Sequence, residues 1–307
     1  MKYQVDRTVS GNLSRIFFTL ERASRDKRLE MPDLNVVLDA AREIRGAMSI
    51  AQSIDNYLDA HRADSVINLV GKMAICQAII EREATSNITS PDSSNIYNQF
   101  DFSRSENTWL NAFLRKVTEG IPREEIERVF ANVAIVTFNY DRCIEQYLFY
   151  ALQRYYRASE QDVISALSNL QIVHVYGKVG RLPWQRGASS AVPFGDLSKA
   201  NLFDVASTIS TFTEARYDSA VIDDIAAAFD NAVRIIFLGF SFQEQNVDVL
   251  PQVASHVDIF GTAQGMSNTN LKVIENKLPA HFKLVKQLVL DDIGAEAFID
   301  NYWRVLE

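Results

Sequence analysis

Residues 134–141 read AIVTFNYD, a short β-branched apolar run that ends in a polar turn, and a segment with helical spacing follows it. Four similar apolar runs come later in the chain, again separated by segments that suit helices. Strands that alternate with helices in this way predict a parallel sheet covered on both faces. The expected strands are 134–138, 172–176, 234–238, 257–260 and 284–289, and the expected helices between them are 143–156, 222–232 and 270–278.

The residues before this region have a different pattern. Apolar residues between 34 and 58, and again between 66 and 82, recur at helical spacing, and segment 109–117 predicts a further helix. The polar segment 85–95 predicts a loop. We therefore expect an all-helical region over residues 1–127. A Rossmann-like α/β core over residues 128–307 should follow it, with a parallel sheet of about five strands and helices on both faces.

Composition excludes several classes of protein. The 307 residues are 47% hydrophobic and 23% charged, which is ordinary for a globular protein. A formal net charge of −8 argues against a nucleic-acid partner, because phosphate binding needs a basic surface. No apolar run reaches the roughly 18–20 residues that cross a bilayer, and the patch 16–20 is too short for a secretory signal. We expect a cytoplasmic protein with no membrane partner.

The chain has two cysteines, Cys76 and Cys143, each inside an expected helix. Two distant thiols cannot form a zinc site of the Cys-rich type, and a cytosolic compartment disfavours a disulfide. We expect both thiols to be reduced, unpaired and buried, and we expect no metal site.

Three of the expected strands end in polar or glycine-containing turns. Ligands of parallel α/β sheets bind at the carboxyl ends of the strands, so these turns are candidates for a shared site. Each turn also has a structural explanation, because Asn and Asp cap helices and Gly forms tight turns. The residues concerned are Thr137, Asn139 and Asp141 after the first strand, Gly177 after the second, and Gly239, Ser241 and Asn246 after the third.

Together and in this order, the turns resemble the bacterial sirtuin-like family. Segment 137–141 (TFNYD) is similar to its Thr-Gln-Asn-x-Asp segment, and segment 173–177 (VHVYG) to its strand that ends in His-Gly. Segment 238–242 (LGFSF) is similar to its Gly-x-Ser turn, and 258–261 (DIFG) falls where another strand reaches the adenosine end. The resemblance covers about residues 130–265.

The resemblance implies NAD as the ligand and hydrolysis of its nicotinamide–ribose bond, the reaction of many sirtuin-like proteins of anti-phage defence. Asn139 would hold the water or the ribose, and Asp141 the nicotinamide amide. Ser241 and Asn246 would bind phosphate or ribose hydroxyls, while Thr137, Gly177 and Gly239 would complete the NAD site. The helical region would cover the nucleotide. A zinc-dependent lysine deacylase is not expected, since those enzymes usually carry a four-cysteine zinc ribbon.

Two departures from the family pattern keep a second interpretation open. The Gly-Ala-Gly-x-Ser loop that cradles a pyrophosphate is not found in residues 1–60, which predicts weak NAD binding. Tyr176 stands before Gly177, where the family has its catalytic His, and His174 lies two residues earlier. His174 is either a core residue or the base, and Tyr176, with an ordinary pKa of about 10, is a poor base at neutral pH. Both stay catalytic candidates.

The second interpretation is therefore a non-catalytic or truncated sirtuin-like interaction module. Such a module would keep the fold without turnover, and its partner would be another protein or a second copy of the chain.

Overall fold

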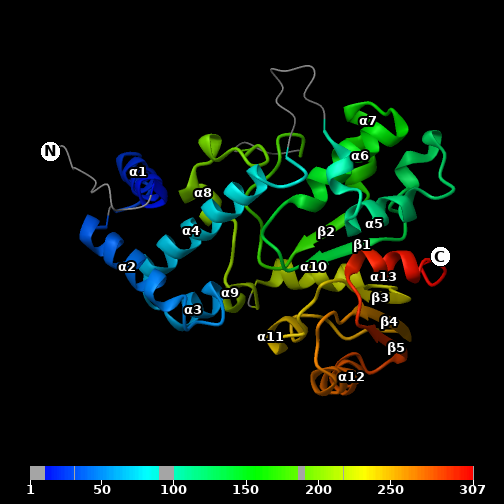
Figure 1. The fold of residues 1–307 in the computed structure, drawn as a ribbon. Helices are drawn as coiled ribbons and strands as arrows, with labels where there is room; N and C mark the ends of the chain where they lie inside the picture. The colour runs from blue at the N-terminus through cyan, green and yellow to red at the C-terminus, as the bar shows by residue number, and fades with distance from the viewer. Residues whose placement is uncertain (1–10, 31, 90–99, 186–190, 217, 307) are drawn as a thin grey trace. The chain divides into compact units, whose positions relative to one another are not determined.

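The computed structural model describes residues 11–30, 32–89, 100–185, 191–216 and 218–306 (Figure 1). Within these ranges the chain forms two compact units, each built from three separate segments. The first unit comprises Met1–Ser90, Asn139–Arg142 and Tyr176–Tyr217, and the second comprises Pro91–Phe138, Cys143–Val175 and Asp218–Glu307.

The first unit is a helical bundle around one long central helix. Its elements are α1 (Gly11–Arg25), α2 (Leu34–Ala47), α3 (Ile54–Ala60), α4 (Ser65–Ala84), the short 3₁₀ helix η3 (Leu197–Lys199), α8 (Leu202–Ala206) and α9 (Phe212–Arg216). The central helix α4 packs against α1, α2, α3 and α8.

Side-chain caps and apolar stripes explain why these helices form where they do. The carboxylate of Asp64 accepts hydrogen bonds from the backbone N–H groups of Val66 and Ile67 and so starts α4. Helix α4 has buried residues along its whole length, among them Met73 and Ile80. The helical region predicted over the first part of the chain is confirmed.

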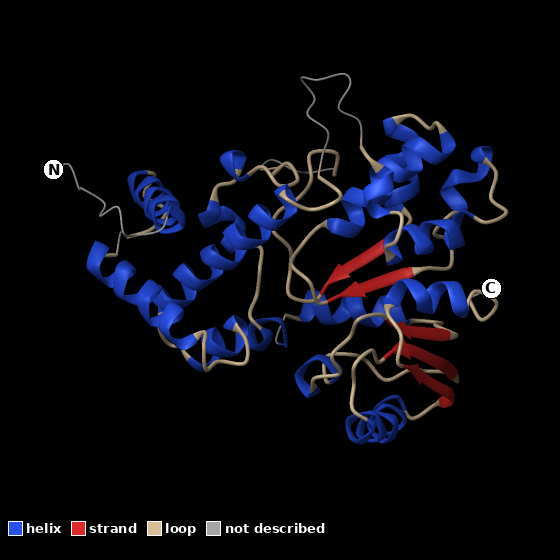
Figure 2. Ribbon diagram, viewed as in Figure 1, coloured by secondary structure: helices blue, strands red, loops and turns tan. Residues whose placement is uncertain are grey.

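The second unit carries all five described strands and the helices around them. Its elements are η1 (Phe102–Ser105), α5 (Trp109–Thr118), η2 (Arg123–Arg128), β1 (Ala134–Thr137), α6 (Cys143–Tyr156), α7 (Glu160–Ser168), β2 (Gln171–His174), α10 (Ser219–Phe229), β3 (Arg234–Phe237), α11 (Glu244–Val247), β4 (Val257–Thr262), α12 (Asn268–Phe282), β5 (Val285–Asp291) and α13 (Ala295–Asn301). All pairings between these strands are parallel, so the predicted α/β class is confirmed (Figure 2).

The strands do not form the single sheet that we predicted. Among the described residues, β1 pairs with β2 in one sheet, and β3, β4 and β5 form a second sheet in that order. Aromatic side chains lie where the two sheets approach each other. The ring of Phe138, directly after β1, packs 5.1 Å from the ring of Phe240, which follows β3. The carboxyl ends of β1 and β3 therefore meet through side chains, and α10 packs on both β1 and β2.

Within the part of the chain that the structure describes, no helix combines the length and the apolar character needed to span a bilayer.

Candidate functional site

The carboxyl ends of β1 and β2 lie side by side in the second unit. Thr137 and His174 are register partners at the last position of each strand. The backbone N–H of Val175 donates to the carbonyl of Thr137 over 2.9 Å, which extends the pairing by one residue. The structure therefore brings two of the predicted site residues together.

The side chain of His174 is buried and contacts helix α6. Its Nε2 lies 3.1 Å from Oε1 of Glu145, and the two side chains are only 5% and 3% exposed. Glu145 stands in the first turn of α6, which begins two residues after the last residue of the TFNYD segment. A buried carboxylate needs such a partner, since an isolated buried charge is costly. The geometry is that of a core histidine held by a carboxylate.

Tyr176 lies in a turn, and not on the strand as we predicted. Strand β2 ends at His174, so the predicted strand over residues 172–176 is two residues too long at this end. The Tyr176 side chain is buried, and its ring centroid lies 6.3 Å from that of Tyr140. Burial raises the pKa of Tyr176 to about 12, and the charge of Asp55 contributes to the rise. Tyr176 is therefore protonated at neutral pH and can act there as a hydrogen-bond donor, not as a base.

Tyr140, between Asn139 and Asp141, is fixed by helix α3. Its hydroxyl donates to Oδ1 of Asp55 over 2.5 Å and lies 3.2 Å from the carbonyl oxygen of Ser210. Burial, together with the neighbouring carboxylate of Asp55, raises the pKa of Tyr140 strongly. Asn139 is exposed and Asp141 half-buried. These contacts all lie within the first unit.

The two glycines that follow β2 and β3 both have positive φ but differ in what surrounds them. Gly177 has a φ of +75°, and a Cβ added there would lie 2.0 Å from the carbonyl oxygen of Thr208. Packing within the chain therefore requires a glycine at position 177. Gly239 has a φ of +62°, yet a Cβ there would meet nothing within 4 Å. The turn after β3 therefore has open space above its backbone, where a ligand could approach.

The turn after β3 presents Ser241 to solvent. Its first residue, Gly239, donates its N–H to Oγ1 of Thr262 over 2.8 Å. Its last residue, Phe242, has a φ of +54° and is buried, with its ring 5.2 Å from that of Phe237. A phenylalanine at positive φ is an outlier that the surrounding packing must hold in place. Ser241 is exposed between these two anchors.

The remaining predicted residue of this turn region is Asn246. It lies in the short helix α11, is half-buried, and donates its backbone N–H to the carbonyl of Gln243 over 3.0 Å. The predicted site residues are divided between the two units. The second unit contains Thr137, His174, Gly239, Ser241 and Asn246, and the first unit contains Asn139, Asp141, Tyr176 and Gly177. Among the described residues, no group of three or more His, Cys, Asp or Glu side chains is arranged to hold a metal ion.

Residues 133–256 match the family model described as a SIR2-like domain. This segment of the chain is similar to a SIR2-like domain. The match covers less than half of the chain, but it includes β1, β2 and β3 and every predicted site residue from Thr137 to Asn246. The resemblance predicted for residues 130–265 is confirmed over this range. Searches among curated proteins and among solved structures gave no significant match.

Two carboxylates that contact residues of the SIR2-like segment, Glu145 and Asp55, were missed from the sequence. Glu145 could have been noticed, because it is an acid within a helix of otherwise largely apolar and aromatic residues that begins two residues after Asp141. Asp55 carried no signal, since it comes from the helical region more than eighty positions before Tyr140 and reads as an ordinary first-turn acid of a helix.

Proposed function

We propose that the chain binds NAD and hydrolyses the bond between nicotinamide and ribose. The observation that carries the proposal is that the SIR2-like match contains the whole set of predicted site residues, in the predicted order. The open space above Gly239 and the exposed hydroxyl of Ser241 fit a ligand with phosphates and ribose hydroxyls. Asn139 and Asp141 supply the amide and carboxylate that nicotinamide and ribose would engage.

The residues suit a mechanism in which water is positioned but not deprotonated beforehand. As the C–N bond breaks, nicotinamide leaves with the bonding electrons and the ribose carbon becomes oxocarbenium-like. A neutral water attacks that carbon and releases a proton to solvent, which gives ADP-ribose. Asn139 holds this water or the ribose. Keeping the water in line with the ribose carbon that it attacks raises the rate, because the reacting atoms are already oriented. No base is required from His174, which is bonded to Glu145, or from Tyr176, whose pKa is raised to about 12.

The proposal extends to a cytoplasmic protein of anti-phage defence. Hydrolysis of NAD in the cytoplasm would deplete the pool on which an infecting phage depends. Support for this role is the sirtuin-like resemblance, which many defence proteins share.

A second candidate function is an NAD-binding or protein-binding module without turnover. It is favoured by the burial of both residues that could replace the family's catalytic His. The partner in that case is another protein or a second copy of the chain. The two candidates differ in one measurable outcome, which is whether nicotinamide is released.

The test is nicotinamide release, followed by chromatography over several hours of incubation with NAD. We expect slow release by the wild-type chain and none by Asn139→Ala, because the variant loses the group that holds the water or ribose. Asn132→Ala is the matched control, since Asn132 is an exposed asparagine before β1, at the other end of the strand.

NAD titrations by calorimetry separate the remaining outcomes. Binding without release identifies the module. Release that Asn139→Ala leaves unchanged means that the site is wrong. Neither NAD binding nor release contradicts the hydrolase and the NAD-binding module and leaves only the protein-binding module.

A further inference from the structure

The residue that follows Asp141 is an arginine whose side chain is completely buried. Nε and Nη2 of Arg142 donate to the two oxygens of Glu83, over 3.0 and 2.5 Å, and Nη1 donates to the carbonyl of Val192 over 2.5 Å. The backbone N–H of Arg142 also donates to Glu83, over 3.2 Å. The exposed fractions of the Arg142 and Glu83 side chains are 0% and 1%. The pair is therefore a two-pronged ion pair shielded from water.

Glu83 also holds a third segment of the first unit. Its Oε2 accepts a hydrogen bond from the backbone N–H of Gly195 over 3.1 Å. A Cβ at Gly195 would lie 2.6 Å from the backbone of Ala84, so only glycine allows this close approach. The end of α4, the segment Asn139–Arg142 and the segment around Gly195 thus meet at one carboxylate.

A second anchor holds the same segment two residues earlier. Tyr140 donates to Asp55 of α3, and the Tyr140 carbonyl accepts the N–H of Val179 over 3.0 Å. Alternate residues, Tyr140 and Arg142, are therefore tied to helices of the first unit. Asn139, beside the second anchor at Tyr140, is exposed, and Asp141 stands between the two anchors.

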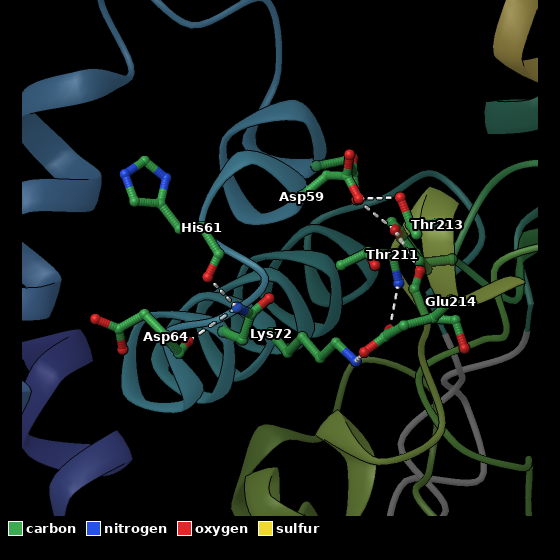
Figure 3. A network of polar contacts seen from close by, with 11 residues as sticks. Asp59, His61, Asp64, Lys72, Thr211, Thr213 and Glu214 are labelled. Carbon is green, nitrogen blue, oxygen red and sulfur yellow. Dashed lines mark hydrogen bonds and ion pairs between the residues drawn. The ribbon is translucent and has the colours of Figure 1, made fainter.

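The helices that supply these anchors are themselves linked by polar contacts, drawn in Figure 3. Thr213 of α9 donates to Asp59 of α3, and Lys72 of α4 pairs with Glu214 of α9 over 2.6 Å. Glu214 also accepts the backbone N–H of Thr211 over 2.7 Å. Helices α3 and α4 are thus both linked to α9.

Stability alone is a weak reason for a buried ion pair. Taking two charges out of water costs about as much free energy as their attraction returns, and apolar replacements of similar volume are often neutral. A bidentate arginine–carboxylate pair does fix direction and distance, because its donors and acceptors match in geometry.

We propose that Glu83 and Arg142 are positioning residues that fix the segment Asn139–Asp141 for its work on NAD. This inference rests on the proposed function and assigns to α4 a role beyond covering the nucleotide. The ion pair acts through the segment, and neither of its members needs to touch NAD.

The test replaces both charges together, in the full chain, with Glu83→Leu/Arg142→Met. A single replacement would leave a buried charge without its partner and destabilise the fold strongly for that reason alone. The double variant keeps similar volume and leaves no unpaired buried charge, so its thermal midpoint should fall only by the cost of the backbone N–H groups of Arg142 and Gly195 that lose Glu83 and of the Val192 carbonyl that loses Arg142. Lys72→Met is the matched control, because it removes an ion pair of the same helix that does not touch segment 139–142.

The first readout does not depend on NAD. The amide of Val179 donates to the Tyr140 carbonyl, so its hydrogen exchange reports whether the segment stays in place. We expect its exchange in the double variant to rise roughly tenfold or more, while amides of α2 keep their protection. Wild-type exchange at Val179 in a folded double variant overturns the inference.

The second readout is turnover. Misplacing a catalytic group by about 1 Å can cost ~10²-fold in rate, so kcat should fall by that order while KM changes by less than about threefold. Arg142→Lys keeps the positive charge but cannot form the bidentate pair. It should fold and show a smaller fall in kcat, again with little change in KM. If the double variant does not fold, Arg142→Lys tests the positioning role in its place. Unchanged kcat in a folded variant overturns the inference. Absence of release by the wild type contradicts the proposed function instead, and Val179 exchange then decides the positioning role by itself.

Discussion

At the scale of single residues, similar sequence signals have different physical causes. Gly177 and Gly239 each follow a strand and each have positive φ, yet only Gly177 is packed against another backbone. His174 and Tyr176 both read as possible substitutes for a catalytic histidine. One is bonded to Glu145 and the other lies buried near Tyr140. Their residue types could be read from the sequence, but their partners could not.

The glycine contrast predicts an order of stabilities. Gly239→Ala should cost about 1–2 kcal/mol, because only its left-handed backbone opposes a side chain. Gly177→Ala should cost more, since a clash with the carbonyl of Thr208 is added. Gly46→Ala is the control: Gly46 lies within helix α2 with nothing near its Cβ position, so alanine should be neutral or stabilising. Urea midpoints of the three variants measure this order, and equal losses at Gly177 and Gly239 would contradict it.

The raised pKa of Tyr176 predicts a loss of stability at alkaline pH. The unfolded chain releases the tyrosine proton near pH 10, whereas burial holds it to about pH 12 in the folded protein. The contribution of Tyr176 is therefore fully present below about pH 10 and is lost between about pH 10 and 12. Unfolding free energies measured from pH 8 to 11.5 should fall less steeply for Tyr176→Phe, by at most ~1.4 kcal/mol per pH unit. Equal slopes for variant and wild type would show that Tyr176 titrates normally.

At the scale of elements, the sequence predicted the type and order of the helices and strands better than it predicted which strands pair. Helix α6 has the predicted bounds of residues 143–156, and each predicted strand overlaps an observed one. Strand β2 ended two residues early, and the backbone beyond it pairs with another segment: the Tyr176 carbonyl accepts the N–H of Ser210, and Gly177 forms an antiparallel bridge with Ile209. Helix α7 was missed although its signal was present: Ser159 and Asp162 form a capping box, each side chain bonding the backbone of the other.

Which strands pair could not be predicted from the sequence, for a physical reason. The periodicity of a strand says which face is buried but not which neighbour it bonds, so five parallel strands were predicted as one sheet. The aromatic rings of Phe138 and Phe240, which lie between the ends of β1 and β3, come from residues more than a hundred positions apart. The anchors of the Asn139–Asp141 segment escaped for the same reason, since Asp55 and Glu83 lie in the helical region.

At the scale of the whole molecule, the chain passes between its two units at the segments that carry the resemblance. It enters the first unit at Asn139, leaves it after Arg142, and enters it again at Tyr176. Each unit is therefore assembled from distant parts of the sequence. The domain boundary predicted between residues 127 and 128 stays a prediction. The SIR2-like match itself contains segments of both units.

The two cysteines report on the two units separately, because Cys76 belongs to the first and Cys143 to the second. Both lie in helices as predicted and neither is paired in a disulfide, but only Cys76 is fully buried, and burial raises its pKa to about 12. Since the thiolate is the reactive form, we expect Cys143 to react first with a thiol reagent at pH 8, and Cys76 only when its unit opens.

Cys143→Ser and Cys76→Ala assign the two phases of this reaction. Denatured without reductant, the wild-type chain should give two free thiols. Native-state reaction of Cys76 ahead of Cys143 would mean that the core of the first unit is open in solution. The loss of both thiols in the denatured, unreduced protein would contradict the expected reduced state. A Cys76 phase that follows the urea unfolding curve would show instead that α4, and with it Glu83, stays packed until its unit unfolds.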